Sequence, residues 1–238
     1  MATTQTAKKT IAFVLYPELT PLDLVGPLQV LTSLSAIEPR FRVVVVAERI
    51  APLASDIEVP LIADKTFAEV PRPDIIFVPG GVTGTLRAMR DETLLRYVRD
   101  AAESAEIVAS VCTGSLILAS AGLLRGRPST THWVAPGVLE NFGARYHRKR
   151  WVEDGKLIMA AGVSAGIDMA LHLVDRLTDR ETARRVQLAI EYDPQPPFGG
   201  IDWQRLGLMP RIVRAVVSLA APLMTRRPKR IARQAGWS

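Results

Sequence analysis

A single cysteine is the residue best placed to do chemistry in this sequence. Cys112 follows the apolar run Glu106–Val111, and Thr113-Gly114-Ser115 comes directly after it. A buried strand that turns sharply into a helix holds the residue at the turn above the sheet, which is the geometry of a nucleophile elbow. The amides and dipole of the first helical turn are expected to lower the pKa of the thiol. The pattern favours a nucleophile over the common alternative, an inert cysteine in the core.

A second apolar run ends in a glycine pair. In Ile75–Gly84, a buried strand is followed by Pro79, Gly80 and Gly81, where no side chain blocks the approach to the backbone. Backbone N–H groups exposed in this way can stabilise negative charge that develops on a substrate. A tight turn is the ordinary explanation of Gly-Gly. Beside an elbow cysteine, however, Gly80 and Gly81 become candidate oxyanion-binding or substrate-binding residues.

A carboxylate in an apolar setting follows the first strand. In Tyr16–Pro27, Asp23 stands between Leu22 and Leu24. Because ligands bind beyond the carboxyl ends of parallel strands, Asp23 could approach the cysteine there and act as an acid or base. Two alternatives stay open. Asp23 can instead cap or charge a helix N-terminus, which spacing alone favours, and Glu18 in the same loop is a rival acid.

The histidines indicate neither a metal site nor a clear catalytic partner. His132, His147 and His172 lack the spacing of zinc ligands. His132 could form a cysteine–histidine pair with Cys112, as in hydrolases and amidotransferases. Thr113 rather than a histidine follows the cysteine, so we expect a secondary or structural role for His132. The sequence contains no Walker motif and no GxGxxG, and we therefore expect no metal and no cofactor.

The elements that must position these residues alternate along the chain. Apolar runs predict strands, and helical spacing of apolar residues predicts the helices between them. The expected strands are 10–15, 41–47, 74–78 and 106–111, the expected helices are 22–35, 92–104, 167–177 and 182–191, and a hairpin is expected over 144–152 and 156–160. Continuous apolar strands that alternate with helices are typical of an α/β protein, with a mostly parallel sheet covered by helices on both faces.

Composition separates a neutral body from a basic tail. The chain has 238 residues and a net charge of +6. Residues 201–238 hold eight Lys or Arg against one Asp and so carry +7, which leaves −1 for residues 1–200. The Pro- and Gly-rich segment 193–200 predicts a boundary between a domain over 1–200 and a basic, partly helical appendage over 201–238. The neutral body predicts no nucleic-acid partner. For the tail, packing on the body or disorder is favoured over a helix that binds a membrane surface or a partner.

The redox state and compartment follow from the cysteine and the N-terminus. One cysteine cannot form an internal disulfide, which is typical of a reduced, cytoplasmic protein. The polar stretch 1–9 has no apolar segment behind it and does not predict a signal peptide. The uncharged stretch 107–124 is broken by Ser and Gly, and we interpret it as a buried strand followed by a buried helix.

The chain resembles the ThiJ/PfpI superfamily from about Thr10 to Gly200. The motifs that carry the resemblance are LDLVGP with Asp23, FVPGG with Gly80 and Gly81, SVCTGSLILASAGLLRGRPSTTHW with Cys112 and Thr113, AGVSAGIDMAL and RVQLAIEYDPQPPF. Aspartate replaces the glutamate of much of the superfamily, and threonine rather than histidine follows the cysteine. Together with the EYDPQPPF segment, these features are similar to those of the members that hydrate isocyanides.

The resemblance implies a flavodoxin-like three-layer sandwich, a homodimer and the conversion of small isocyanides to N-substituted formamides. Cys112 would attack the terminal carbon, Asp23 would protonate and position water, and a thioimidate intermediate would be held by Thr113 and the backbone near Gly81. An ionised Asp23 beside a thiolate would raise both pKa values, so we expect a coupled pair that shares a proton.

The substrate pocket and the alternative functions are less constrained. Trp133, Met159 and Val163 are candidates for lining an apolar pocket, and ordinary core packing is the alternative for each. The sensor domains of some AraC-type regulators resemble this pattern too, so a ligand-binding module or a redox sensor using Cys112 is the alternative function. The segment after Gly200 is short for the pair of helix-turn-helix units of such regulators, which favours an enzyme.

Overall fold

Apolar strands buried on both faces form the centre of the sheet. The computed structural model describes residues 8–205 and 207–225. The strands β1 (Lys9–Val14), β4 (Ile75–Val78), β5 (Ile107–Val111) and β9 (Leu157–Ala160) lie side by side in a seven-stranded sheet. The order is β3-β2-β1-β4-β5-β9-β8, where β2 is Phe41–Ala47, β3 is Lys65–Thr66 and β8 is Trp151–Asp154. Every pairing is parallel except that of β8 with β9.

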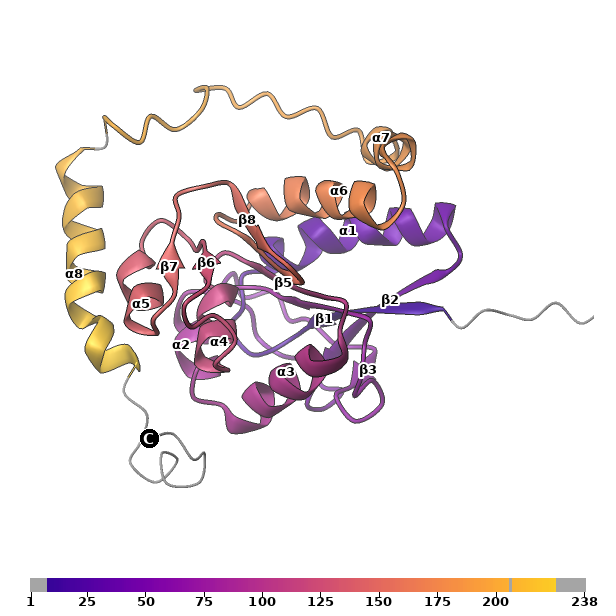
Figure 1. Cartoon of the computed structure of the whole chain (residues 1–238), viewed down its shortest axis with the longest axis horizontal. Coiled ribbons are helices and arrows are strands. Elements are labelled where there is room, and N and C mark those ends of the chain that lie inside the picture. Colours follow the sequence, from indigo (N-terminus) through magenta and orange to yellow (C-terminus); the bar gives the residue numbers. More distant parts are fainter. Residues whose placement is uncertain (1–7, 206, 226–238) are drawn as a thin grey trace, which may run out of the picture.

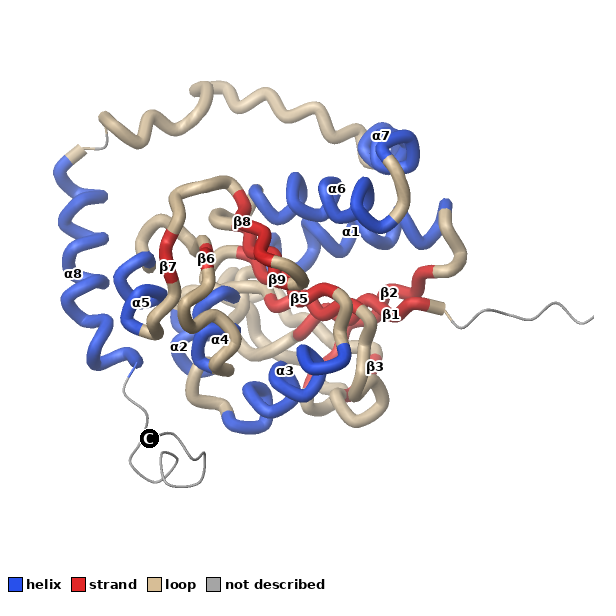
Figure 2. The backbone as a smooth tube through the Cα atoms, viewed as in Figure 1, coloured by secondary structure: helices blue, strands red, loops and turns tan. Residues whose placement is uncertain are grey.

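Helices cover both faces of this sheet, as the sequence predicts. One layer contains α1 (Pro21–Ile37), α6 (Ala165–Leu177) and α7 (Arg180–Ala189), and the other contains α2 (Thr83–Ala88), α3 (Glu92–Ser104), α4 (Gly114–Ser120) and α5 (Pro136–Asn141) (Figure 1). Figure 2 shows the strands between the two helix layers. The three-layer α/β sandwich is therefore confirmed. Because β1, β4 and β5 are parallel neighbours, the loops that follow them meet at one edge of the sheet.

The predicted hairpin is wrong in its first arm. The arm expected over 144–152 is split into β7 (Arg145–Tyr146) and β8, which begins only at Trp151. The four residues between them, 147–150, are all polar and all exposed, so they cannot continue a strand with one buried face. The strand β7 instead pairs in parallel with β6 (Pro128–Ser129) in a separate small sheet.

The appendage returns to the body as one long helix. The appendage, expected to be partly helical, contains α8 (Leu208–Thr225), which lies along α5 (Figure 1). The backbones approach closely, because a Cβ added to Gly137 in α5 would lie 2.6 Å from the hydroxyl oxygen of Ser218. Ala221 is buried, and Arg90 donates a hydrogen bond to the carbonyl of Leu223 at 3.4 Å. The basic run 226–233 lies outside the described residues.

The helix α8 is apolar on its outer side as well. Among the described residues, it is the one helix long and apolar enough to cross a membrane, judged by length and composition alone. Its inner side packs on α5, whereas Met209, Val216 and Leu219 on the outer side are exposed. The packed inner side agrees with the favoured expectation for the tail.

Candidate active site

The elbow holds Cys112 in a strained backbone conformation. Cys112 follows β5 directly and has a φ of 57°, in the left-handed region that non-glycine residues rarely adopt. Its N–H donates to the carbonyl of Ala160 at 3.0 Å, and its own carbonyl accepts hydrogen bonds from Ser115 Oγ at 3.1 Å and Thr131 Oγ1 at 3.3 Å. These bonds keep the residue in place against a strain of about 1–2 kcal/mol. The thiol is therefore fixed at the turn, as predicted.

Asp23 lies beside this thiol and is completely buried. It is in the first turn of α1, and its Oδ2 accepts a hydrogen bond from the N–H of Gly80 at 3.1 Å. The other oxygen, Oδ1, is buried and has no hydrogen-bond partner among the described residues. The carboxyl also interacts with the thiol of Cys112. The carboxylate is thus directed to the elbow. Asp23 does not cap the helix, since the N-cap residue is Thr20, but it does lie in the first turn, as the helix N-terminus alternative predicts.

Glu18 is directed elsewhere. Its carboxylate pairs with Arg87 and accepts a hydrogen bond from Thr83 Oγ1 at 2.8 Å. Both partners belong to α2. Of the two rival carboxylates, Asp23 is therefore the one that the fold brings to the cysteine.

Burial makes the two acidic groups reluctant to ionise. It raises the pKa of Asp23 to about 7, although the Cys112 thiol and the Gly80 N–H act against this shift. Burial and the nearby Asp23 charge raise the pKa of Cys112 well above its ordinary value. Both directions agree with a coupled pair. The expected lowering of the thiol pKa is wrong in sign, because desolvation and Asp23 outweigh the hydrogen bonds from Thr113.

Thr113 connects the elbow to the Pro-Gly-Gly loop. Its hydroxyl donates to the carbonyl of Gly81 at 2.6 Å and accepts the Gly81 N–H at 3.0 Å, and Thr85 Oγ1 lies 2.9 Å away. The N–H of Gly81 and the hydroxyl of Thr113 are thus each other's partners in this structure. Both the backbone and the side chain of Thr113 also act on the thiol of Cys112 and oppose the rise of its pKa. A direct role of Thr113 and Gly81 in holding an intermediate stays a prediction.

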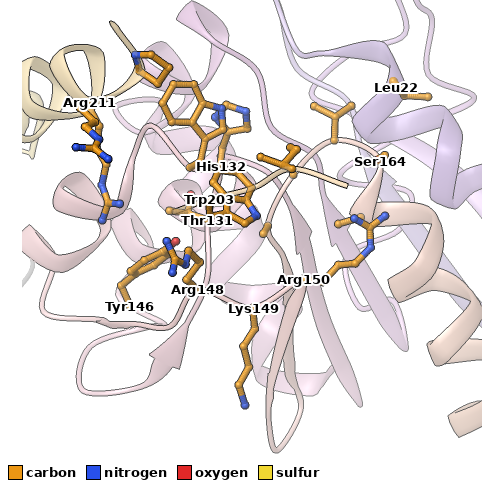
Figure 3. Close-up of a pocket in the computed structure, with 18 residues that line it drawn as sticks. Leu22, Thr131, His132, Tyr146, Arg148, Lys149, Arg150, Ser164, Trp203 and Arg211 are labelled. Carbon is orange, nitrogen blue, oxygen red and sulfur yellow. The ribbon is translucent and has the colours of Figure 1, made fainter. Parts of the chain in front are cut away.

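A cavity of about 660 Å³ lies near the elbow, although neither Cys112 nor Asp23 is among the residues that line it. It is lined by Leu22, Thr131, His132, Trp133, Tyr146, Arg148, Lys149, Arg150, Ala161, Gly162, Val163, Ser164, Ala165, Ile201, Trp203, Pro210, Arg211 and Arg214 (Figure 3). Three of these residues lie close to the elbow, two as neighbours in the chain and one through a hydrogen bond. Leu22 precedes Asp23, Thr131 is hydrogen-bonded to Cys112, and Ala161 follows the residue that accepts the Cys112 N–H.

The predicted lining residues divide between wall and core. His132, Trp133 and Val163 line the cavity, as expected. Met159 does not, because its place in β9, between β5 and β8, buries it completely in the core. Burial lowers the pKa of His132, and no hydrogen bond joins it to Cys112 within the described part of the chain. Sequence reasoning missed Trp203, Arg211 and the other wall residues of the appendage, because no local spacing signals long-range packing.

The described residues contain no cluster of three or more His, Cys, Asp or Glu side chains that could hold a metal ion.

Comparison with known proteins agrees with this geometry. The family model described as the DJ-1/PfpI family matches residues 9–176. The isonitrile hydratase of Pseudomonas putida is 44% identical over 188 residues, which are 79% of this chain and 80% of that protein. The transcriptional regulator CdhR of Pseudomonas aeruginosa is 31% identical over 158 residues, which are 63% of this chain but 44% of the regulator.

Solved structures show the same fold. A ThiJ/PfpI family protein from Pseudomonas syringae superposes with a TM-score of 0.81 at 35% identity, covering 97% of this chain and 92% of that one. DJ-1beta of Drosophila melanogaster has a TM-score of 0.70 at 20% identity, covering 79% of this chain and all of that one. The elbow, its carboxylate and the matched length lead to one conclusion: the chain belongs to the DJ-1/PfpI family.

Proposed function

We propose that the protein hydrates isocyanides to N-substituted formamides through a covalent bond to Cys112. The observation that carries the proposal is the buried Asp23 beside the thiol, with one carboxyl oxygen that has no partner among the described residues. That oxygen can exchange a proton with the sulfur, the substrate or a water molecule. The identity of 44% to an isonitrile hydratase supports the same reaction.

The pair can supply every proton of the reaction. Its active form holds one shared proton. The thiolate attacks the terminal carbon, a carbon–sulfur bond forms, and Asp23 protonates that carbon to give a thioimidate. Asp23 then takes a proton from water while the oxygen attacks the same carbon, and it passes this proton to the nitrogen. When the carbon–sulfur bond breaks, the hydroxyl proton returns to Asp23 and the formamide leaves. One water is consumed and the pair is restored.

The thiol pKa argues against the redox-sensor alternative. Cysteines that sense oxidants have a lowered pKa and are accessible to solvent. Cys112 has a raised pKa and is 6% exposed. A thiol that ionises only when its neighbour accepts the proton suits a reaction in which that neighbour returns the proton to the substrate.

The proposal is tested by incubating the full chain with an aryl isocyanide and following the formamide by chromatography. Mass spectrometry of quenched samples is expected to find the substrate mass added to the peptide that contains Cys112. If the isocyanide persists and the peptide stays unmodified, the proposal is overturned.

The pH dependence of kcat/KM is expected to reflect the coupled pair. Below the Asp23 pKa of about 7, both groups are protonated and the thiolate is absent. We therefore expect kcat/KM to fall about tenfold per pH unit below pH 6 and to level off above pH 8. A stopped-flow assay between pH 5 and 9 would check this. A profile that is flat, or that declines from pH 6 to 8, would contradict it.

Gly80 is expected to tolerate no side chain. A Cβ there would lie 2.6 Å from the backbone nitrogen of Thr113 and 2.8 Å from Asp23 Oδ2. We expect Gly80→Ala to lower kcat about 100-fold, since small displacements of catalytic groups have effects of this size. The thermal unfolding midpoint is also expected to fall. Gly200→Ala is the matched control, because an added Cβ there meets nothing within 4 Å. Equal activity of the two variants would argue against the positioning of Asp23 by this loop.

We also propose that the protein works as a homodimer in the cytoplasm. The family resemblance supports the dimer, and the single cysteine is typical of a reducing compartment. Light scattering on the purified chain tests the first part, and a monomer at micromolar concentration would overturn it. Fractionation of cells that produce the protein tests the second.

A further inference from the structure

The cavity beside the catalytic pair is positively charged at one end. Arg148, Arg211 and Arg214 line it, and none of the three is paired with a carboxylate among the described residues. No Asp or Glu belongs to the lining. Arg150 also lines the cavity but is neutralised by its ion pair with Asp168. Three arginines therefore line this space without a carboxylate partner in the described part of the chain, and Lys149 adds a fourth such cation to the lining.

The arginines gather around one tyrosine. The guanidinium of Arg214 lies over the ring of Tyr146, 5.9 Å from its centre. Burial raises the pKa of Tyr146, while Arg214 and Arg148 oppose this shift more strongly than Glu140 adds to it. Figure 3 shows Tyr146, Arg148 and Arg211 together at one end. The electrostatic potential at this end is thus positive although one acidic residue is close by.

The opposite end of the cavity lies toward the elbow that holds Cys112. Leu22 and Ser164 lie away from Arg148 and Arg211 in Figure 3, on the side of Arg150, whose charge is paired with Asp168, and Leu22 immediately precedes Asp23. Between the two ends, His132 and Trp203 provide aromatic surface. Because burial lowers the pKa of His132, this middle section is uncharged at neutral pH. The cavity therefore has one end toward the elbow, an aromatic middle and a cationic end.

We infer that the cavity selects isocyanides that carry a carboxylate, separated from the isocyano group by an aromatic spacer. This inference rests on the proposed function and deepens it by naming a substrate class. Guanidinium groups bind carboxylates through paired, charge-assisted hydrogen bonds. A carboxylate at the Tyr146 end would also relieve the repulsion among three unpaired cations. A neutral isocyanide would leave that repulsion in place.

The test compares 4-isocyanobenzoate with its methyl ester, which differ in charge but share the ring and the isocyano group. We expect kcat/KM to be about tenfold higher for the acid, mainly through a lower KM, and the ratio to shrink as salt is added. In Arg148→Gln, Arg211→Gln and Arg214→Gln, the acid-to-ester ratio is expected to fall toward one. Arg72→Gln, which removes an exposed arginine outside the cavity, is expected to retain the wild-type ratio.

The outcomes separate this inference from the proposed function. If wild type hydrates both compounds with equal kcat/KM, the carboxylate preference is overturned and the reaction stands. If neither compound is hydrated, the proposed reaction fails, and calorimetry with 4-formamidobenzoate and its methyl ester then decides the binding preference. Tighter binding of the acid, lost in the Arg148 and Arg211 variants but not in the Arg72 variant, supports the cationic site. Equal binding rejects it. Circular dichroism establishes that each variant is folded.

Discussion

Replacing Cys112 by alanine is expected to lower kcat/KM for an aryl isocyanide at least about 10⁴-fold, because no other nucleophile is placed at the elbow. The adduct seen by mass spectrometry is expected to disappear together with turnover. Alanine keeps the Cβ, so the strain at φ 57° stays and the elbow is not relaxed. The thiol is also the partner that interacts with Asp23, so the variant removes the nucleophile and half of the proton pair at once.

Cys112→Ser serves as the matched control for this result. The hydroxyl preserves a hydrogen-bond donor toward Asp23 but is a much weaker nucleophile than a thiol. We expect it to be nearly as inactive as the alanine variant while its near-ultraviolet circular dichroism matches wild type. If either variant retained turnover within tenfold of wild type, covalent catalysis by Cys112 would be excluded, and Asp23 acting on water directly would take its place.

Replacing Asp23 by asparagine is expected to remove activity and to increase stability. Loss of the acid-base group lowers kcat about 10²–10⁴-fold. The stability effect follows from the pKa, which is 3.8 for the ordinary group and about 7 in the folded protein. The folded state therefore binds the proton more tightly than the unfolded state, and the free energy of unfolding of wild type falls as pH rises from about 4 to about 7. A shift of this size corresponds to about 2–4 kcal/mol above pH 7.

The asparagine variant lacks this titration. Its free energy of unfolding, measured by urea denaturation at pH 8, is expected to exceed that of wild type, and the two are expected to converge near pH 4. Asp56→Asn is the matched control, because Asp56 is exposed and contributes only a weak charge effect at Asp23. A variant that is both active and no more stable at pH 8 would show that the buried carboxylate is neither strained by burial nor needed for proton transfer.

The catalytic pair could be found from the sequence because it depends on the ends of strands. Parallel apolar strands place their following loops at one edge of the sheet. Cys112 and Asp23 each follow such a strand, and the same topology brings Gly80 between them. Glycine is required two residues after the cysteine, since a Cβ on Gly114 would collide with the carbonyl of Val78. These constraints act on the residues directly after each strand, so they can be recognised in a single sequence.

Other features depend on contacts between distant segments and could not be predicted. The sign of the Cys112 pKa shift follows from how deeply the sulfur is buried and from Asp23, whereas Thr113, which follows it in sequence, acts in the opposite direction. Met159 has an apolar side chain that would suit the pocket, but it is completely buried in the core. Arg211 and Arg214 reach the cavity only because α8 packs on α5, and nothing in the spacing of the appendage predicts that packing.

The docking of α8 places part of the cavity lining on a different segment from the residues that hold the catalytic pair. The groups that hold Cys112 and Asp23 belong to Gly80, Ser115, Thr131 and Ala160, whereas Trp203, Arg211 and Arg214 belong to the appendage. Substitutions of Trp203, Arg211 and Arg214 would therefore alter the proposed substrate preference without changing a residue that holds the catalytic pair. An exchange of residues 201–214 between relatives would transfer the part of this preference that Arg211 and Arg214 carry, while Arg148 would stay with the body.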